Sequence, residues 1–238
     1  MRFKTFEDAE AMSRRAAGIM AAAVAAKPDL LLCAASGGSP TRAYDLFAAD
    51  KARGARLRVI KLDEWAGMGV DNSASCEAYL RRHLVGPLAI PEARFLSFDA
   101  TADAVAECAR VERKLDAEGP IDLLILGVGV NGHLGLNEPA EALTPECHVA
   151  TLAETSRAHP MLEGSARAPS EGLTLGMAGI LQARHILVLV AGGHKLHAME
   201  KFLTRRVTAA FPASFLWLHG NCDFLCDGAA MAGLEAPA

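Results

Sequence analysis

Residues 121–129 read IDLLILGVG, a short apolar run that ends in glycines. Three other stretches have the same form, DLLLCAAS at 29–36, RLRVIKL at 56–62 and HILVLVA at 185–191. Their apolar residues are nearly continuous rather than alternating, which is typical of strands buried on both faces. The runs therefore predict a parallel sheet covered by helices.

Helical patterns separate these runs. The first is Ala-rich, extends from about Thr5 to Ala26 and is stopped by Lys27-Pro28. Others lie at 41–50, 75–84, 103–119 and 194–203. This alternation predicts the α/β class, a doubly wound, mainly parallel sheet with helices on both faces. No composition shift or repeat divides the chain, so we expect one domain over 1–238.

Composition excludes several classes of protein. The 238 residues include 24 Lys and Arg against 28 Asp and Glu, and the net charge of −4 argues against a nucleic-acid partner. No apolar run reaches bilayer length, and the start MRFKTFEDAEAMSRR lacks the apolar region of a signal peptide, so no membrane partner is expected. The six scattered cysteines favour reduced thiols and a cytoplasmic protein.

A metal site has little support in the sequence. His219, Cys222 and Cys226 are closely spaced, but no second Cys/His pair complements them. Buried thiols beside a last strand, within NCDFLCD, are the better interpretation. We expect no metal.

Ligands of such sheets bind at the carboxyl ends of the strands. The first loop there is Ser36–Pro40, SGGSP, before a helix that opens at Pro40 or Thr41. Its glycines and the helix N-terminus could hold a phosphate, or the loop could be a plain strand-to-helix turn. It is not a Walker A loop.

The second loop is Lys61–Trp65, KLDEW, at the end of the strand RLRVI. One acid could lie over the sheet edge and the other could make a structural hydrogen bond. Partial desolvation would raise the pKa of the first carboxyl and suit it to act as a base. The alternative is an exposed, solvated turn.

The third loop, Gly127–Pro139, reads GVGVNGHLGLNEP and presents Asn131, His133 and Glu138 close together. His133 can exchange protons near neutral pH, and Glu138 could orient it. A dinucleotide fingerprint is formally matched, but HLGLNEP does not open a helix.

The fourth loop, Ala191–Lys195, reads AGGHK and repeats the strand–glycine–helix arrangement. Lys195 would lie in the first turn of the following helix, where its charge opposes the helix dipole. A residue that breaks a local rule at this edge is a candidate anion ligand.

Together the four loops resemble the glucosamine-6-phosphate deaminase and 6-phosphogluconolactonase superfamily over nearly the whole chain. The specific part is LDEW about sixty residues before GVGVNGHLGLNEP. Within the superfamily, VIKLDEW, NGHLGLNEP, ECHVATL and PASFLWLHGN are closest to the galactosamine-6-phosphate isomerase branch.

The resemblance implies isomerisation coupled to deamination, which turns an amino-hexose 6-phosphate into a ketohexose 6-phosphate and ammonia. It implies that Asp63 is the base between C2 and C1, and that His133 opens the pyranose ring with Glu138 holding it. Lys195 and Gly37-Gly38-Ser39 match the phosphate-binding positions. The sugar phosphate is the expected small-molecule partner, no cofactor is expected, and a homo-oligomer is possible.

Three departures from the better-studied glucosamine enzyme stand out. Asn131 replaces an Asp, although Asn can still orient His133. Leu162 falls where that enzyme has a phosphate-binding Arg, so Arg42, Arg157 or His159 would take over part of the phosphate. The basic residues of the allosteric site in hexameric relatives have no counterpart around HVATL, so that regulation is not expected.

Three other functions remain as alternatives. The first is glucosamine-6-phosphate deaminase. Galacto and gluco substrates differ in the orientation of the C4 hydroxyl, and no single residue of the sequence can be identified as the one that distinguishes them. The second is 6-phosphogluconolactonase. Glu138 argues against it because lactonases resemble this motif only up to the Gly-His pair and then have apolar residues before the proline. Trp65 argues against it because lactonases tend to carry Arg after Asp-Glu. The third is a non-catalytic sugar-phosphate sensor, which would need a DNA-binding extension.

Overall fold

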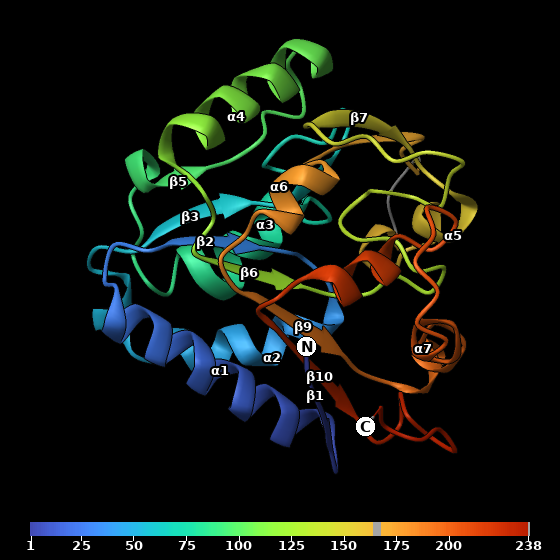
Figure 1. Cartoon of the computed structure of the whole chain (residues 1–238). Coiled ribbons are helices and arrows are strands. Elements are labelled where there is room, and N and C mark those ends of the chain that lie inside the picture. The colour runs from blue at the N-terminus through green and yellow to red at the C-terminus, as the bar shows by residue number, and fades with distance from the viewer. Residues whose placement is uncertain (164–167, 238) are drawn as a thin grey trace.

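The computed structural model describes residues 1–163 and 168–237, and a seven-stranded sheet forms its centre (Figure 1). All neighbouring strands of this sheet are parallel. Their spatial order is β1 (Arg2–Phe6), β10 (Cys222–Asp227), β9 (Ile186–Val190), β6 (Leu123–Leu126), β2 (Leu31–Ala34), β3 (Arg58–Lys61) and β5 (Phe95–Leu96).

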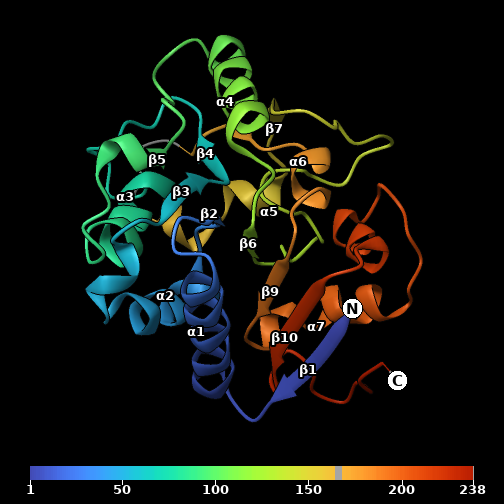
Figure 2. The ribbon, with the colours of Figure 1, turned by 60° about the vertical axis from the view of Figure 1, so that its left-hand side comes forward.

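Helices cover both faces of the sheet (Figure 2). One face packs against α1 (Ala9–Ala26), α2 (Gly38–Ala48) and α3 (Cys76–Leu80), which continues as a π-helical turn, Arg81–Val85. The other packs against α4 (Ala104–Glu118), α6 (Met177–Leu181) and α7 (Leu196–Leu203). Alternate strand residues enter opposite cores, so Cys33 belongs to one and Leu32 to the other. This double burial explains the nearly continuous apolar runs and confirms the predicted fold class.

A second, smaller sheet lies beside the main one and was not predicted. Its three antiparallel strands are β4 (Asp63–Trp65), β8 (Glu171–Thr174) and β7 (His148–Thr151), followed by α5 (Glu154–Arg157). It places Asp63–Trp65 of the KLDEW segment in a buried strand, so the expected alternative of an exposed, solvated turn is wrong.

Two predicted boundaries need correction. Thr5 and Phe6 belong to β1 rather than to the first helix, which begins after Asp8, whose Oδ1 accepts from the N–H of Ala11 at 2.7 Å. Helix α2 starts at Gly38, before the predicted Pro40 or Thr41. Pro40 is tolerated there because the first helical N–H groups have no partner within the helix.

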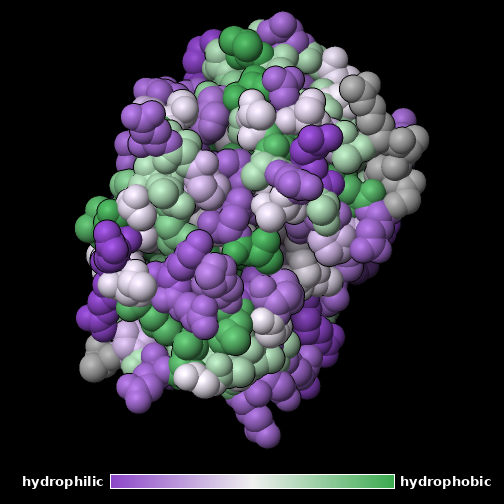
Figure 3. Space-filling model, turned by 90° about the vertical axis from the view of Figure 1, so that its right-hand side faces the viewer, coloured by the Kyte–Doolittle hydropathy of each residue, from purple (hydrophilic) through white to green (hydrophobic). Residues whose placement is uncertain are grey.

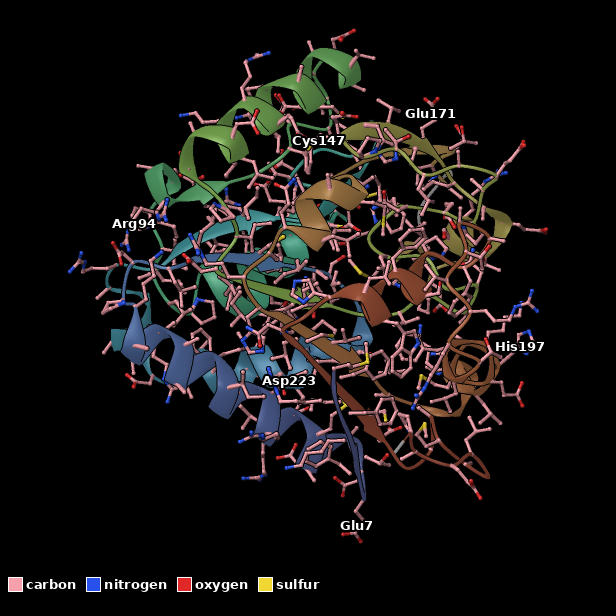
Figure 4. All side chains as sticks on the ribbon, in the orientation of Figure 1. Glu7, Arg94, Cys147, Glu171, His197 and Asp223 are labelled. Atoms are coloured by element: carbon pink, nitrogen blue, oxygen red, sulfur yellow. The ribbon has the colours of Figure 1, made fainter. Side chains whose placement is uncertain are left out.

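An ion pair connects β1, at the edge of the sheet, to its neighbour β10 near the amino ends of the two strands. Arg2 of β1 donates from Nε to Asp223 Oδ1 of β10 at 2.8 Å, and Asp223 is labelled in Figure 4. All six cysteines are free. None of the helices in the described part of the chain is both long and apolar enough to cross a bilayer.

Candidate active site

The four loops singled out in the sequence follow β2, β3, β6 and β9, whose parallel alignment brings their carboxyl ends to one edge of the sheet. Figure 3 views this side of the molecule, where hydrophilic residues are interspersed with several smaller groups of hydrophobic ones. The topology therefore gathers the predicted loops on one side, as open α/β sheets do at their ligand sites.

Asp63 begins β4 and has only 7% of its surface exposed. Its Oδ1 has no hydrogen-bond partner among the described residues. Burial raises the pKa of Asp63 to about 7, the negative charge of Glu64 adds to the rise, and Lys61 opposes it. A carboxylate with a free oxygen and a pKa near neutrality can accept a proton from a ligand.

Glu64, the adjacent acid, is fully engaged with the protein. It accepts hydrogen bonds from Lys61 Nζ at 2.7 Å and from the backbone N–H groups of Trp65, Cys76 and Glu77, each at 2.9 Å. One acid therefore makes structural hydrogen bonds and the other keeps a free oxygen, which matches the division of roles expected from the sequence.

Asn131 holds the imidazole of His133 in place. Its Oδ1 accepts from the backbone N–H of His133 at 3.1 Å and lies 2.8 Å from the ring Nδ1. Its Nδ2 donates to Glu138 Oε2 at 2.9 Å, and that oxygen lies 3.5 Å from His133 Nδ1. The three residues thus form one network, and a Cβ at Gly129 would overlap the ring.

The carboxyl of Glu138 stays ionised in this network. Burial alone would raise its pKa, but hydrogen bonding and charge attraction from His133, with further hydrogen bonds from Ser156 and Asn131, lower it to about 2. The Oγ of Ser156 lies 3.3 Å from His133 Nδ1, a contact that the sequence did not indicate. Glu138 is therefore a fixed negative charge next to the imidazole.

Thr174 of β8 connects the strand of Asp63 to the loop of His133. It is the cross-strand partner of Asp63, and its Oγ1 accepts from the backbone N–H of Leu136 at 3.2 Å. Sequence reasoning missed Thr174 because β8 carries no apolar run and is recognised only by its pairing.

The loop Ser36–Pro40 presents the start of an uncapped helix. Gly37 has φ +117°, and no side chain caps the first N–H groups of α2. The carbonyl oxygen of Gly37 accepts hydrogen bonds from Tyr79 Oη at 2.8 Å and Thr41 Oγ1 at 2.9 Å, which fix the loop. Gly37, Gly38 and Ser39 thus lie where helix N–H groups are open to an anion.

Lys195 ends a 3-10 turn, Gly193–Lys195, just before α7, and burial lowers the pKa of its ammonium group. The preceding loop is held by Asp227 at the end of β10, whose two carboxylate oxygens accept from the N–H of Gly192 at 3.1 and 3.0 Å. Asp227 is a second residue that the sequence did not single out.

The other candidate phosphate ligands are placed differently. The Arg42 guanidinium pairs with Glu10 of α1 at 2.7 Å, so binding an anion would require that ion pair to break. Arg157 ends α5 and is exposed. Leu162 packs in an apolar cluster with Trp65 and Leu136.

No group of three or more potential metal ligands occurs within residues 1–163 and 168–237. Cys222 and Cys226 are buried in β10, while the ring of His219 lies 2.8 Å from the carbonyl oxygen of Ala183. The three residues are thus used in packing and backbone contacts.

Comparisons with known proteins find relatives over nearly the whole chain. The family model described as glucosamine-6-phosphate isomerases/6-phosphogluconolactonase matches residues 5–224. The chain is 39% identical to the Escherichia coli (strain K12) protein named "Putative deaminase AgaI", over 92% of this chain and 88% of that one. It is 33% identical to the glucosamine-6-phosphate deaminase of Bacillus pumilus (strain SAFR-032), over 93% and 95%. A solved structure of a monomeric glucosamine-6-phosphate deaminase superposes with a TM-score of 0.90 at 32% identity and covers 99% of this chain and all of that one.

Proposed function

Because the chain belongs to the glucosamine-6-phosphate isomerase/6-phosphogluconolactonase family, we propose that it isomerises and deaminates an amino-hexose 6-phosphate. The preferred reaction converts galactosamine 6-phosphate and water into tagatose 6-phosphate and ammonia. The observation that carries the proposal is Asp63, a buried carboxylate with an unpartnered oxygen and a pKa near 7.

The first step is opening of the sugar ring. The network of Asn131 and Glu138 holds His133 through Nδ1, which leaves Nε2 to exchange a proton with the ring oxygen. Glu138 stays ionised in this network, so a negative charge lies 3.5 Å from Nδ1 while Nε2 exchanges the proton.

The second step moves a proton between carbons. Asp63 removes the proton from C2 of the open-chain aldehyde, the electron pair forms a C1–C2 double bond, and O1 takes up a proton to give an enolamine. Return of a proton to C1, with loss of a proton from the nitrogen, then leaves an imine at C2 and a hydroxyl at C1. A carboxyl with a pKa near 7 can accept and return this proton at neutral pH without a large energetic cost in either direction.

Hydrolysis of the imine completes the reaction. Water adds to C2, the C2–N bond breaks, and ammonia leaves the ketose 6-phosphate. Atoms and charges balance with water as the only co-reactant. In this proposal Lys195 and the Gly37-Gly38-Ser39 backbone bind the phosphate, because an ammonium group and helix N–H groups are typical ligands of that anion.

We propose galactosamine 6-phosphate as the preferred substrate because four segments resemble the galactosamine-6-phosphate isomerase branch of the superfamily. These segments are VIKLDEW, NGHLGLNEP, ECHVATL and PASFLWLHGN. Glucosamine 6-phosphate, giving fructose 6-phosphate, is the second candidate, supported by the name of the B. pumilus relative. The six free thiols are consistent with the cytoplasm, which we propose as the location.

The test measures ammonia release from both amino-sugar phosphates and hydrolysis of 6-phosphogluconolactone. We expect ammonia from both, with kcat/KM at least about tenfold higher for galactosamine 6-phosphate, a difference that corresponds to about 1.4 kcal/mol. Equal or reversed values would overturn the preference. Lactone hydrolysis without ammonia release would overturn the proposed function.

A further inference from the structure

His159 lies at the start of a 3-10 turn, Pro160–Leu162, that follows α5. Its Nδ1 accepts a hydrogen bond from the backbone N–H of Met161 at 3.2 Å. A neutral imidazole has one acceptor nitrogen and one donor nitrogen, so this contact places the proton on Nε2. His159 is therefore fixed as an Nε2–H donor.

The donor nitrogen of His159 faces the loop at the start of α2. A Cβ built on Gly37 would lie 3.9 Å from His159 Nε2, which is the only heavy atom of the described residues within 4 Å of it outside Gly37 and its chain neighbours. The ring also lies against Trp65, with the ring centroids 6.0 Å apart. Within residues 1–163 and 168–237, Nε2 has no hydrogen-bond partner, although the ring is partly buried.

The electrostatic surroundings keep this imidazole neutral. Burial lowers the pKa of His159, and with the smaller effect of the positive charges of His133 and Lys195 it falls to about 4. His133 and Lys195 thus make the surroundings of His159 an electropositive corner. The three residues come from distant parts of the chain. An anion in that corner would be attracted by both neighbours and would find the Nε2–H donor unused.

We propose that His159 is a substrate-binding residue whose Nε2–H donates to the phosphate group of the amino-hexose 6-phosphate, between the start of α2 and Lys195. The inference rests on the proposed function, and it assigns to His159 a contact made by a neutral donor rather than by a third cation. In the proposed reaction Asp63 acts on the reacting carbons and His133 acts on the ring oxygen. Gly37 lies at the anion-binding end of the site.

Two substitutions separate this contact from the local fold. In His159→Asn the side-chain oxygen can still accept from the N–H of Met161, as Asn does at helix starts, but no donor reaches the position of Nε2. In His159→Gln the longer amide can again place an N–H there. The control is His197→Asn, because His197 has a side-chain exposure of 70% on α7 and points outward in Figure 4.

The measurements are steady-state kinetics and the binding of inorganic phosphate by calorimetry. His159→Asn is expected to raise KM and the phosphate Kd by about tenfold while changing kcat by less than about threefold, as loss of one hydrogen bond to a charged group would. His159→Gln is expected to recover most of the loss, and His197→Asn to match the unmodified protein. For the unphosphorylated amino sugar, kcat/KM should not change in His159→Asn.

Three results would overturn the inference: an unchanged KM and phosphate Kd in His159→Asn, no recovery in His159→Gln, or an equal loss with the unphosphorylated sugar. Each of them is distinct from failure of the proposed function, which would appear as absent ammonia release in the unmodified protein. Phosphate binding tests His159 even in that event.

Discussion

Lys61 Nζ lies 2.7 Å from Glu64 Oε2, and both side chains are 1% exposed. Asp63 stands between them in the sequence and responds to both charges, since Glu64 raises its pKa and Lys61 lowers it. A buried ion pair of this kind adds little net stability after desolvation. Its effect here is on the neighbouring carboxyl, whose proton affinity depends on burial and on two opposed charges.

Replacing the base should stop the reaction and stabilise the fold. Asp63→Asn is expected to lower kcat by several orders of magnitude and to leave KM within about tenfold. The folded state holds the pKa of Asp63 at about 7, above its ordinary 3.8, so folding takes up a proton between these values and stability falls as pH rises. The Asn variant avoids this cost, which is at most about 4 kcal/mol.

The stability part is checked by thermal unfolding of both proteins at about pH 5 and about pH 8. The Tm advantage of Asp63→Asn should be larger at the higher pH. Full ammonia release by the variant would remove Asp63 from the mechanism, and a Tm difference independent of pH would show that the carboxyl titrates normally.

Removing the charge of Glu64 should lower the pKa of Asp63. In Glu64→Gln we expect the acidic limb of the kcat/KM profile to move to lower pH, since burial remains but the adjacent negative charge is lost. The matched control is Glu77→Gln, which also loses a partner of Lys61 at 3.3 Å but is not among the groups acting on Asp63. A limb that moves equally in both variants would contradict this assignment.

Glu138→Gln should shift the pH optimum downward. The substitution removes a negative charge 3.5 Å from His133 Nδ1, which makes protonation of the imidazole less favourable. Because folding lowers the pKa of Glu138 from 4.5 to about 2, its stabilising contribution is present above pH 4.5 and is lost as pH falls toward 2. The variant should therefore lose less stability than the unmodified protein over that window. An unchanged activity profile would restrict Glu138 to a structural role.

Lys195→Ala should weaken substrate binding with little effect on turnover. If Lys195 binds the phosphate as proposed, loss of this partly buried ammonium group should raise KM by about tenfold to hundredfold, with kcat nearly unchanged. Lys201→Ala, which removes an exposed Lys from α7, is the control and should behave like the unmodified protein. If the two Ala variants had equal KM values, Lys195 would not bind the phosphate.

The sequence predicted the main sheet because its strands are buried on both faces and leave an apolar signature. It missed β1 at the sheet edge, because in RFKTF only Phe3 and Phe6 are partly buried and Arg2, Lys4 and Thr5 are exposed. It also missed β7 and β8, since HVAT and EGLT carry no apolar run and become strands only by pairing, β7 with β8 and β8 with both β7 and β4.

The candidate site shows the same division between local and long-range information. Asn131, His133 and Glu138 lie within eight consecutive residues, so their proximity was readable from the sequence. The unpartnered oxygen of Asp63, the closeness of His159 to Gly37 and the anchoring of Gly192 by Asp227 join segments far apart in the chain. Such contacts are set by tertiary packing, which no local pattern encodes.

The pairing of β4 with β8 also bears on the order in which the protein can become active during synthesis. Asp63 leaves the ribosome early, yet the strand that pairs with it ends at Thr174. A nascent chain shorter than this can form β2 and β3 but has no partner for β4. The proton-accepting position therefore arises only when about three-quarters of the polypeptide has been added.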